Sequence, residues 1–477
     1  MITITRRLAS QLKPVFRRAL RLTRGSGPVI SIETGPEGIR VRAGCEDAAV
    51  EYRMAGEFQA EQLSVPFELL ADVEARKDDP VNLEQAGEGR VSASWHDGNV
   101  PQMTQYEVEA GSGKEFPEYP ATTVNNPPRL LAALRDAMAS ADEAPTRYAT
   151  GCIQLRGTGN IAATDGRQIL LQNGFGFPWE DDLIVPRNLV FGSKELPADQ
   201  PVEVGNTEDW LTVRIGAWVF YLRLNKEGRF PKVDDLIRPA DTAATTLSLA
   251  PADRTFLAKT LKSLPTENEL TQPITVDLNG AVAIRAKPED GSQVTELVLR
   301  GSKLTGDPVC FNTNRTFLAR AIALGFEEIH VFDRETPVLC QDQHRQFVWA
   351  LLTPSEAIKS SKDAIRIESP GKEAAVTQPK RQRRKATMAK TPSNGKETSG
   401  NGRPLRNTTA PSEETVPVTA LEQAVELQTV LRGAATKTAE MIRTLKREKK
   451  QSRLVKSALA SLRELQTSLP AGMSADR

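Results

Sequence analysis

Two stretches of the sequence carry the same landmarks in the same order. The first is LSVPFELL at 63–70, followed by KEFPEYP at 114–120; the second is LIVPRNL at 183–189, followed by EGRFPKV at 227–233. The Val-Pro pairs lie 120 residues apart (65 and 185), and the Phe-Pro pairs lie 114 residues apart (116 and 230). Motifs that recur in one order at nearly one interval indicate duplicated domains of roughly 120 residues.

Each repeat shows the pattern of a helix, alternating strands, a second helix that begins at the Val-Pro pair, and further strands. We expect first helices at 5–24, 127–140 and 250–264, and a second helix in the third unit at 314–324. The third unit also contains strand-like segments at 274–278, 282–284 and 347–352. The sequence therefore predicts an α+β fold of three repeated domains, each with two helices and antiparallel sheets, at 1–122, 123–243 and 244–356.

The remainder of the chain differs in composition and charge. Residues 357–477 hold 24 basic and 12 acidic side chains, whereas residues 1–356 carry a net charge of −11. Residues 357–417 are rich in Ser, Thr, Lys, Gly and Pro, which predicts a disordered basic linker. Its run PKRQRRK at 379–385 is either a solvated linker or a phosphate contact. Residues 418–470 have the spacing of an amphipathic helix or helical hairpin.

Several classes of protein are excluded by what the sequence lacks. No window approaches the roughly 18 apolar residues of a membrane span, and no secretory signal follows the first residues, so we expect a cytoplasmic protein without membrane contact. The four cysteines show no metal-binding or disulfide spacing, and the three histidines are scattered. No phosphate-binding loop, carboxylate cluster or nucleophile constellation is present, which predicts no enzyme activity, no cofactor and no metal.

Three short segments carry a resemblance to a known family. They are ATDGR at 163–167, EGRFP at 227–231 and CFNTN at 310–314 with Phe317 and Leu318. In order and spacing they resemble the bacterial β sliding clamp, the processivity subunit of DNA polymerase III, over residues 1–354. The resemblance implies a head-to-tail homodimer of six domains in a closed ring, with helices lining a hole. It also implies a clamp that encircles double-stranded DNA and tethers the replicative polymerase without a cofactor.

The resemblance places basic residues of the predicted helices in the hole. We expect Arg17, Arg21 and Arg24 to be the strongest DNA contacts, since spacings of four and three put them on one helical face. The other expected DNA-binding residues are Arg76, Lys77, Arg135, Arg147, Tyr148, Arg187, Lys194, Lys259 and Lys262, and Arg18, Arg315 and Arg320 also fall on these helices.

The resemblance also implies a cleft that takes short motifs from polymerases and the clamp loader. Carried over residue by residue, the cleft is formed by Thr164, Gly166, Arg167, Ile169, Pro239, Val338, Leu351 and Leu352. The chain departs from the family here, because Ala350–Thr353 replaces Met-Pro-Met-Arg and Arg167-Gln168 replaces His-Arg. An alternative function therefore stays open at this point: a diverged clamp that acts as a DNA-bound scaffold through its tail. A DNA-binding regulator that never closes a ring is a third.

Overall fold

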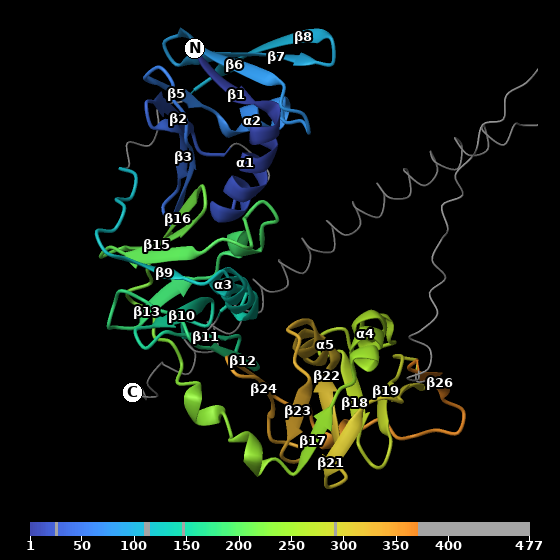
Figure 1. Ribbon diagram of the computed structural model, residues 1–477. Helices are drawn as coiled ribbons and strands as arrows, with labels where there is room; N and C mark the ends of the chain where they lie inside the picture. The colour runs from blue at the N-terminus through green and yellow to red at the C-terminus, as the bar shows by residue number, and fades with distance from the viewer. Residues whose placement is uncertain (24–26, 109–114, 146–147, 291–292, 371–477) are drawn as a thin grey trace, which may run out of the picture. The chain divides into compact units, whose positions relative to one another are not determined.

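The computed structural model describes residues 1–370, apart from 24–26, 109–114, 146–147 and 291–292. All of these residues belong to one compact unit, Met1–Arg381 (Figure 1). The predicted basic run at 379–385 and the predicted helix at 418–470 lie outside the described residues.

The three repeats have one order of elements: a strand, a helix, four strands, a second helix and three strands. In the first repeat these are β1 Ile2–Thr5, α1 Arg6–Ala19, β2 Ile30–Gly35, β3 Gly38–Gly44, β4 Ala48–Met54, β5 Glu61–Val65, α2 Phe67–Val73, β6 Pro80–Gly87, β7 Arg90–Asp97 and β8 Val100–Glu107. In the second they are β9 Thr123–Asn126, α3 Arg129–Ser140, β10 Cys152–Arg156, β11 Asn160–Thr164, β12 Gln168–Gln172, β13 Leu183–Pro186, the 3-10 turn η1 Leu189–Gly192, β14 Val202–Asn206, β15 Trp210–Ile215 and β16 Trp218–Arg223.

The third repeat has the same order with two additions. Its elements are β17 Thr245–Ser248, α4 Pro251–Thr260, η4 Leu261–Ser263, β18 Pro273–Asp277, β19 Val282–Ala286, β20 Thr295–Leu299, β21 Lys303–Gly306, β22 Cys310–Asn314, α5 Arg315–Ala323, β23 Glu328–Val331, β24 Val338–Gln341 and β25 Arg345–Trp349. The short 3-10 turns η2 Asp234–Leu236, η3 Ala240–Thr242 and η5 Pro354–Glu356 lie in connections, and β26 Ile365–Glu368 ends the described chain. The predicted α+β class is confirmed.

The sheets join neighbouring repeats through their edge strands. One sheet has the order β5-β2-β3-β4-β16-β15-β14-β9, so β4 of the first repeat pairs antiparallel with β16 of the second. A second sheet has the order β13-β10-β11-β12-β25-β24-β23-β17-β21, in which β12 pairs antiparallel with β25. The two remaining sheets are β1-β6-β7-β8 and β22-β18-β19-β20-β26. Each junction therefore consists of continuous backbone hydrogen bonding between repeats.

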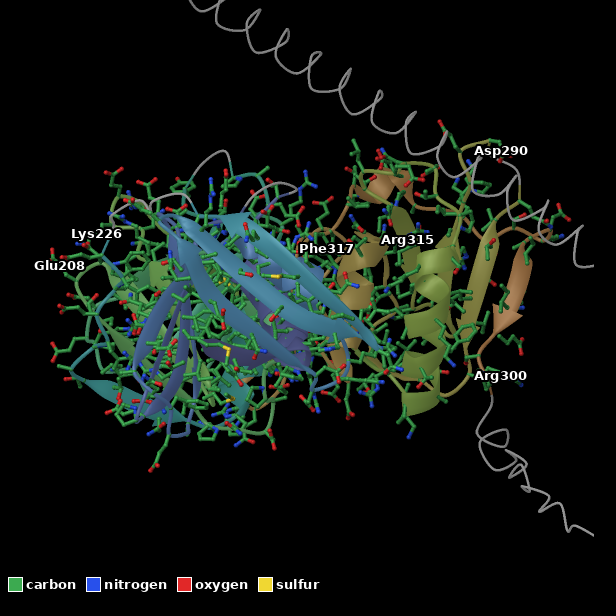
Figure 2. All side chains as sticks on the ribbon, turned by 90° about the horizontal axis from the view of Figure 1, so that it is seen from above. Glu208, Lys226, Asp290, Arg300, Arg315 and Phe317 are labelled. Atoms are coloured by element: carbon green, nitrogen blue, oxygen red, sulfur yellow. The ribbon has the colours of Figure 1, made fainter. Side chains whose placement is uncertain are left out.

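The third repeat has a core of its own. Trp349 is fully buried there, and its indole Nε1 donates to Thr313 Oγ1 at 2.9 Å, which satisfies the one polar atom of that side chain. On α5, the side chains of Arg315 and Phe317 lie near the start of the helix, and Phe317 packs against this core (Figure 2).

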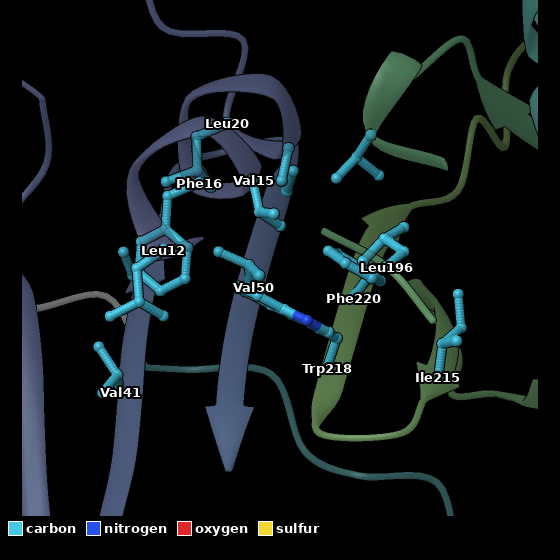
Figure 3. Close-up of a cluster of buried hydrophobic side chains, with 14 of the residues drawn as sticks. Leu12, Val15, Phe16, Leu20, Val41, Val50, Leu196, Ile215, Trp218 and Phe220 are labelled. Carbon is cyan, nitrogen blue, oxygen red and sulfur yellow. The ribbon is translucent and has the colours of Figure 1, made fainter. Parts of the chain in front are cut away.

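The first two repeats share a single hydrophobic core across their junction. Phe16 of α1 meets Trp218 of β16 edge to face, with ring centroids 6.3 Å apart, and Val50 of β4 is the register partner of Phe220 (Figure 3). All four side chains are buried. Because each buried aromatic or aliphatic side chain contributes about 1.5–3 kcal/mol, this junction is held by packing as well as by the ladder.

Three sequence expectations are corrected. The first helix ends at Ala19 rather than Arg24, because Leu20 leaves helical geometry and Arg21 has a positive φ of 52°. The Val-Pro pair of the second repeat begins no full helix: Asn188 caps only the single turn η1, accepting from Val190 N at 3.1 Å. Residues 365–368, assigned to a disordered linker, form strand β26.

Candidate nucleic-acid interface

The helices of the three repeats contact one another in a continuous row: α2, α1, η1, α3, α5, α4. Side chains brace the row where one repeat meets the next. Arg18 of α1 donates to Gly192 O at 3.1 Å and to Ser193 Oγ at 3.2 Å. Arg320 of α5 donates to Asp136 O and to Ser140 Oγ of α3, each at 2.7 Å.

Asn188 ties α1 to η1, the next element of the row. Its side chain is buried, and its Nδ2 donates to Ala19 O, the carbonyl at the end of α1, at 2.8 Å. The same side chain accepts from Val190 N and so caps η1. Sequence analysis did not single out Asn188; its position directly after the Val-Pro-Arg segment is the one available signal.

Exposed cationic side chains are distributed along this row. They are Arg17 on α1, Arg76 and Lys77 after α2, Arg135 on α3, Lys194 after η1, Lys259 on α4 and Lys262 on η4. Tyr148 is also exposed, with 62% of its surface accessible. Such side chains meet phosphate oxygens without reading bases, so the row can hold a nucleic-acid backbone independently of sequence.

Four of the basic residues considered for DNA contact donate hydrogen bonds within the fold. Arg21 lies beyond the helix and donates to Arg187 O. Arg187 donates to Met138 O at 3.0 Å and to Glu143 at 2.8 Å. Arg315 is buried and donates to Gln272 Oε1 at 2.9 Å.

Arg320 is the fourth, and burial lowers the pKa of its guanidinium. Arg17 and Arg21 do not share a helical face, since α1 ends at Ala19. Arg24 and Arg147 lie outside the described residues.

Acidic neighbours modulate the cationic row. The hydrogen bond between Arg135 Nε and Asp136 Oδ1, at 2.9 Å, raises the pKa of Arg135 and offsets part of its charge.

Sequence analysis missed Lys13 and Arg7 of α1. Their side chains pair with Glu74 at 2.8 Å and Asp78 at 3.2 Å, on the loop that carries Arg76 and Lys77.

The ATDGR segment forms the turn between β11 and β12. Thr164 Oγ1 donates to Gln168 O at 2.6 Å, and Asp165 Oδ1 accepts from Arg167 N at 2.8 Å. Gly166 has a φ of +84°, a conformation that suits glycine. The end of β25 meets this turn through a bond from Ala350 N to Arg167 O at 2.9 Å.

The expected cleft residues divide into buried and accessible ones. Thr164 and Ile169 are buried, and Ile169 packs with Phe230 and Val348. Val338 is fully buried in the core of the third repeat and so cannot contact a partner at the surface. The accessible residues are Gly166, Arg167 and Pro239, which are exposed, and Leu351 and Leu352, which are half-buried.

The chain is similar to solved structures of three bacterial proteins. The "DNA polymerase III subunit beta from Pseudomonas aeruginosa" matches with a TM-score of 0.60 and 17% identity, over 74% of this chain and 99% of that one. The fold is that of the DNA polymerase III β clamp. The β subunit of Streptococcus pyogenes matches at TM-score 0.62 and 14% identity, over 73% of this chain and 99% of that one. A putative β subunit from Eubacterium rectale gives 0.59 and 13%, over 74% and 99%.

Comparison of sequences alone finds no relative: no family model matches this chain, and no curated protein matches it significantly. Within the described residues, no group of three or more His, Cys, Asp or Glu side chains is placed to hold a metal ion. In the same part of the chain, none of the helices combines the length and the apolar character needed to cross a bilayer.

Proposed function

We propose that this chain is a DNA sliding clamp: two copies close head to tail into a ring around duplex DNA and tether a DNA polymerase. It acts without catalysing a reaction or holding a cofactor, as a cytoplasmic replication protein. The observation that carries the proposal is the order of the sheets. Both junctions within the chain join the fourth strand of one repeat to the last strand of the next repeat: β4 pairs with β16, and β12 pairs with β25.

The same rule leaves one unjoined half-sheet at each end of the described chain. The first repeat contributes β1-β6-β7-β8, and the third contributes the half-sheet that contains β20. A surface that is complementary to another surface of the same chain supports head-to-tail assembly, which closes when the rotation permits. Two copies with three repeats each then supply six junctions.

The row of helices supports duplex DNA as the ligand of the ring. Its cationic groups are spread over all three repeats rather than gathered into one site, and sequence-independent contacts permit sliding. For the polymerase and the clamp loader, the proposed contact is the accessible part of the cleft: Gly166, Arg167, Pro239, Leu351 and Leu352.

A threading experiment tests the proposal without a loader. A linear duplex is held on a bead by one end, the full-length protein is added at high concentration, and the free end is then blocked with a bulky protein. A wash at 1 M salt, where the Debye length is only about 3 Å, removes proteins held by phosphate contacts alone. A ring stays bound until a restriction enzyme cuts the duplex near the block. Loss in the salt wash whether or not the end is blocked contradicts the ring.

A further inference from the structure

If the junction between subunits followed the two junctions within the chain, a second copy would add its β8 to the edge of β20. At the two junctions within the chain, the equivalent strands β4 and β12 pair directly with β16 and β25. Among the described strands, β8 has one neighbour, β7, so its outer edge is open. The edge of β20 is not open in the same way.

The edge of β20 is already occupied by β26. The two strands run parallel, with Ile365 opposite Thr295 and Ile367 opposite Leu297. Ile365 N donates to Val294 O at 2.8 Å, and Ser369 N donates to Val298 O at 2.9 Å. The outward backbone groups of β20 are therefore used within the chain and are not available to a second copy.

Buried anchors on both sides fasten β26 to the third repeat. On one side, Ile358 is buried and its N donates to Thr275 Oγ1 at 2.8 Å. On the other, Ser369 is buried and its Oγ donates to Oδ1 of the buried Asp253 at 2.5 Å. Arg300 N donates to the same Oγ at 2.9 Å, just beyond the end of β20 (Figure 2). The strand is thus part of the folded repeat.

Ion pairs add to this attachment along the strand. Glu368 lies 3.1 Å from the Arg300 guanidinium, and Arg366 lies 3.4 Å from the Glu296 carboxylate. Both members of the Glu368–Arg300 pair are exposed, so that pair contributes little stability, and the buried Ser369 anchor is the stronger restraint.

The outer edge of β26 has the direction and the exposed apolar side chains that suit pairing with a further strand. Parallel pairing preserves the direction of the sheet edge, so a strand that is antiparallel to β20 is also antiparallel to β26. Ile365 and Ile367 are 47% and 41% exposed, although they lie on the face that carries the fully buried Leu297. On β8, Val100 is 57% exposed and lies on the face of Gln102, the register partner of Trp95.

We propose that β26, rather than β20, is the edge by which a second copy of this chain joins the third repeat, its β8 adding antiparallel to β26. The inference rests on the proposed ring. It makes the segment after β25 a structural part of the subunit interface. It also makes this junction one strand wider than the junctions within the chain, by about 4.8 Å.

Backbone geometry provides a sharp test. In a parallel ladder the hydrogen-bonding direction alternates, so Ile365, Ile367 and Ser369 face β20, and the N–H groups of Arg366 and Glu368 face outward. Glu368→Pro therefore removes an outward donor and leaves the bonds to β20 intact. Glu368→Ala is its matched control, because it loses the same ion pair with Arg300 but keeps the N–H. Ile367→Pro removes an inward donor and detaches β26.

The measurement is the dimer dissociation constant of the full-length variants by sedimentation, with a thermal melt to establish folding. A closed dimer has two such junctions, so Glu368→Pro should raise the dissociation constant on the order of 10- to 100-fold, while Glu368→Ala stays within about threefold. Ile367→Pro should weaken the dimer at least as much as Glu368→Pro.

Two outcomes overturn the inference and are distinguishable. A dimer that tolerates Glu368→Pro, or that becomes tighter with Ile367→Pro, shows that β26 is a removable cover over β20; the ring then stands and the inference fails. A native protein that remains monomeric at tens of micromolar, and is not retained on end-blocked DNA, removes the proposed ring and the inference with it.

Discussion

One buried serine anchors the end of β26, and Ser369→Ala should make the strand open more often. Asp253 is fully buried at the start of α4. Its Oδ2 accepts from Ser302 Oγ at 2.6 Å and from Gly301 N at 3.0 Å, and its Oδ1 accepts from Ser369 Oγ at 2.5 Å. The substitution removes the donor to Oδ1 and the acceptor for Arg300 N.

The expected magnitude follows from the charge of the acceptor. A hydrogen bond to a charged group contributes about 1.5–3 kcal/mol. The side chains of β26 itself are exposed, so the Ser369 contact is a large part of its side-chain attachment. The free energy of local opening should fall by that amount, which raises the population of the open strand by roughly 10- to 150-fold. The melting temperature should change little, because the core of the third repeat does not include β26.

Hydrogen exchange read by mass spectrometry measures this directly. The amide of Ile365 donates to Val294, just before β20, and the amide of Ser369 donates to Val298 of β20. Both amides should exchange roughly 10-fold faster or more in Ser369→Ala. Ser361→Ala is the control, since Ser361 Oγ accepts from Asp363 N, at 3.3 Å, in an exposed turn before β26. Unchanged exchange at 365–369 refutes the reasoning, as does faster exchange spread equally through β18 and β19, which would report unfolding of the whole repeat.

Two further predictions concern charge. Replacing Arg17, Arg135 and Lys194 with Glu should weaken binding to every duplex sequence and reduce the salt slope by about 0.9 for each phosphate that is no longer neutralised. Arg90→Glu, at the exposed first residue of β7, should have no effect. Weaker binding confined to particular sequences would contradict the backbone role. Burial lowers the pKa of His330 below its ordinary 6.5, so the unfolded chain takes up the proton first and stability falls as pH drops below about 6.5. In His330→Gln that acid-induced decrease should be smaller, with melting temperatures compared from pH 8 to pH 5; equal decreases in both proteins would exclude this histidine.

The repeat was predictable from sequence because its landmarks have simple physical causes. Proline at a strand end and alternating apolar residues are local signals, so α3, predicted at 127–140, is found at Arg129–Ser140, and α5, predicted at 314–324, at Arg315–Ala323. The single turn η1 was not predictable, because Asn188 before it and Gly192 at its end are held by long-range contacts with α1. Strand β26 was also missed, since its neighbours in sequence are polar and its pairing with β20 is a long-range contact.

The sequence did not distinguish exposed arginines from those that join neighbouring helices, and the reason is the arginine side chain itself. On a helix of a repeat protein, an arginine either projects into solvent or extends its guanidinium to carbonyl groups of the next element, and both positions have the same sequence pattern. Arg18 and Arg320 donate to such carbonyl groups and so join helices that belong to different repeats. Arg17 and Arg135, one turn or less away from such contacts, stay exposed. The bracing arginines hold the helices of successive repeats at fixed positions, so the exposed cations form a continuous row and not three independent patches.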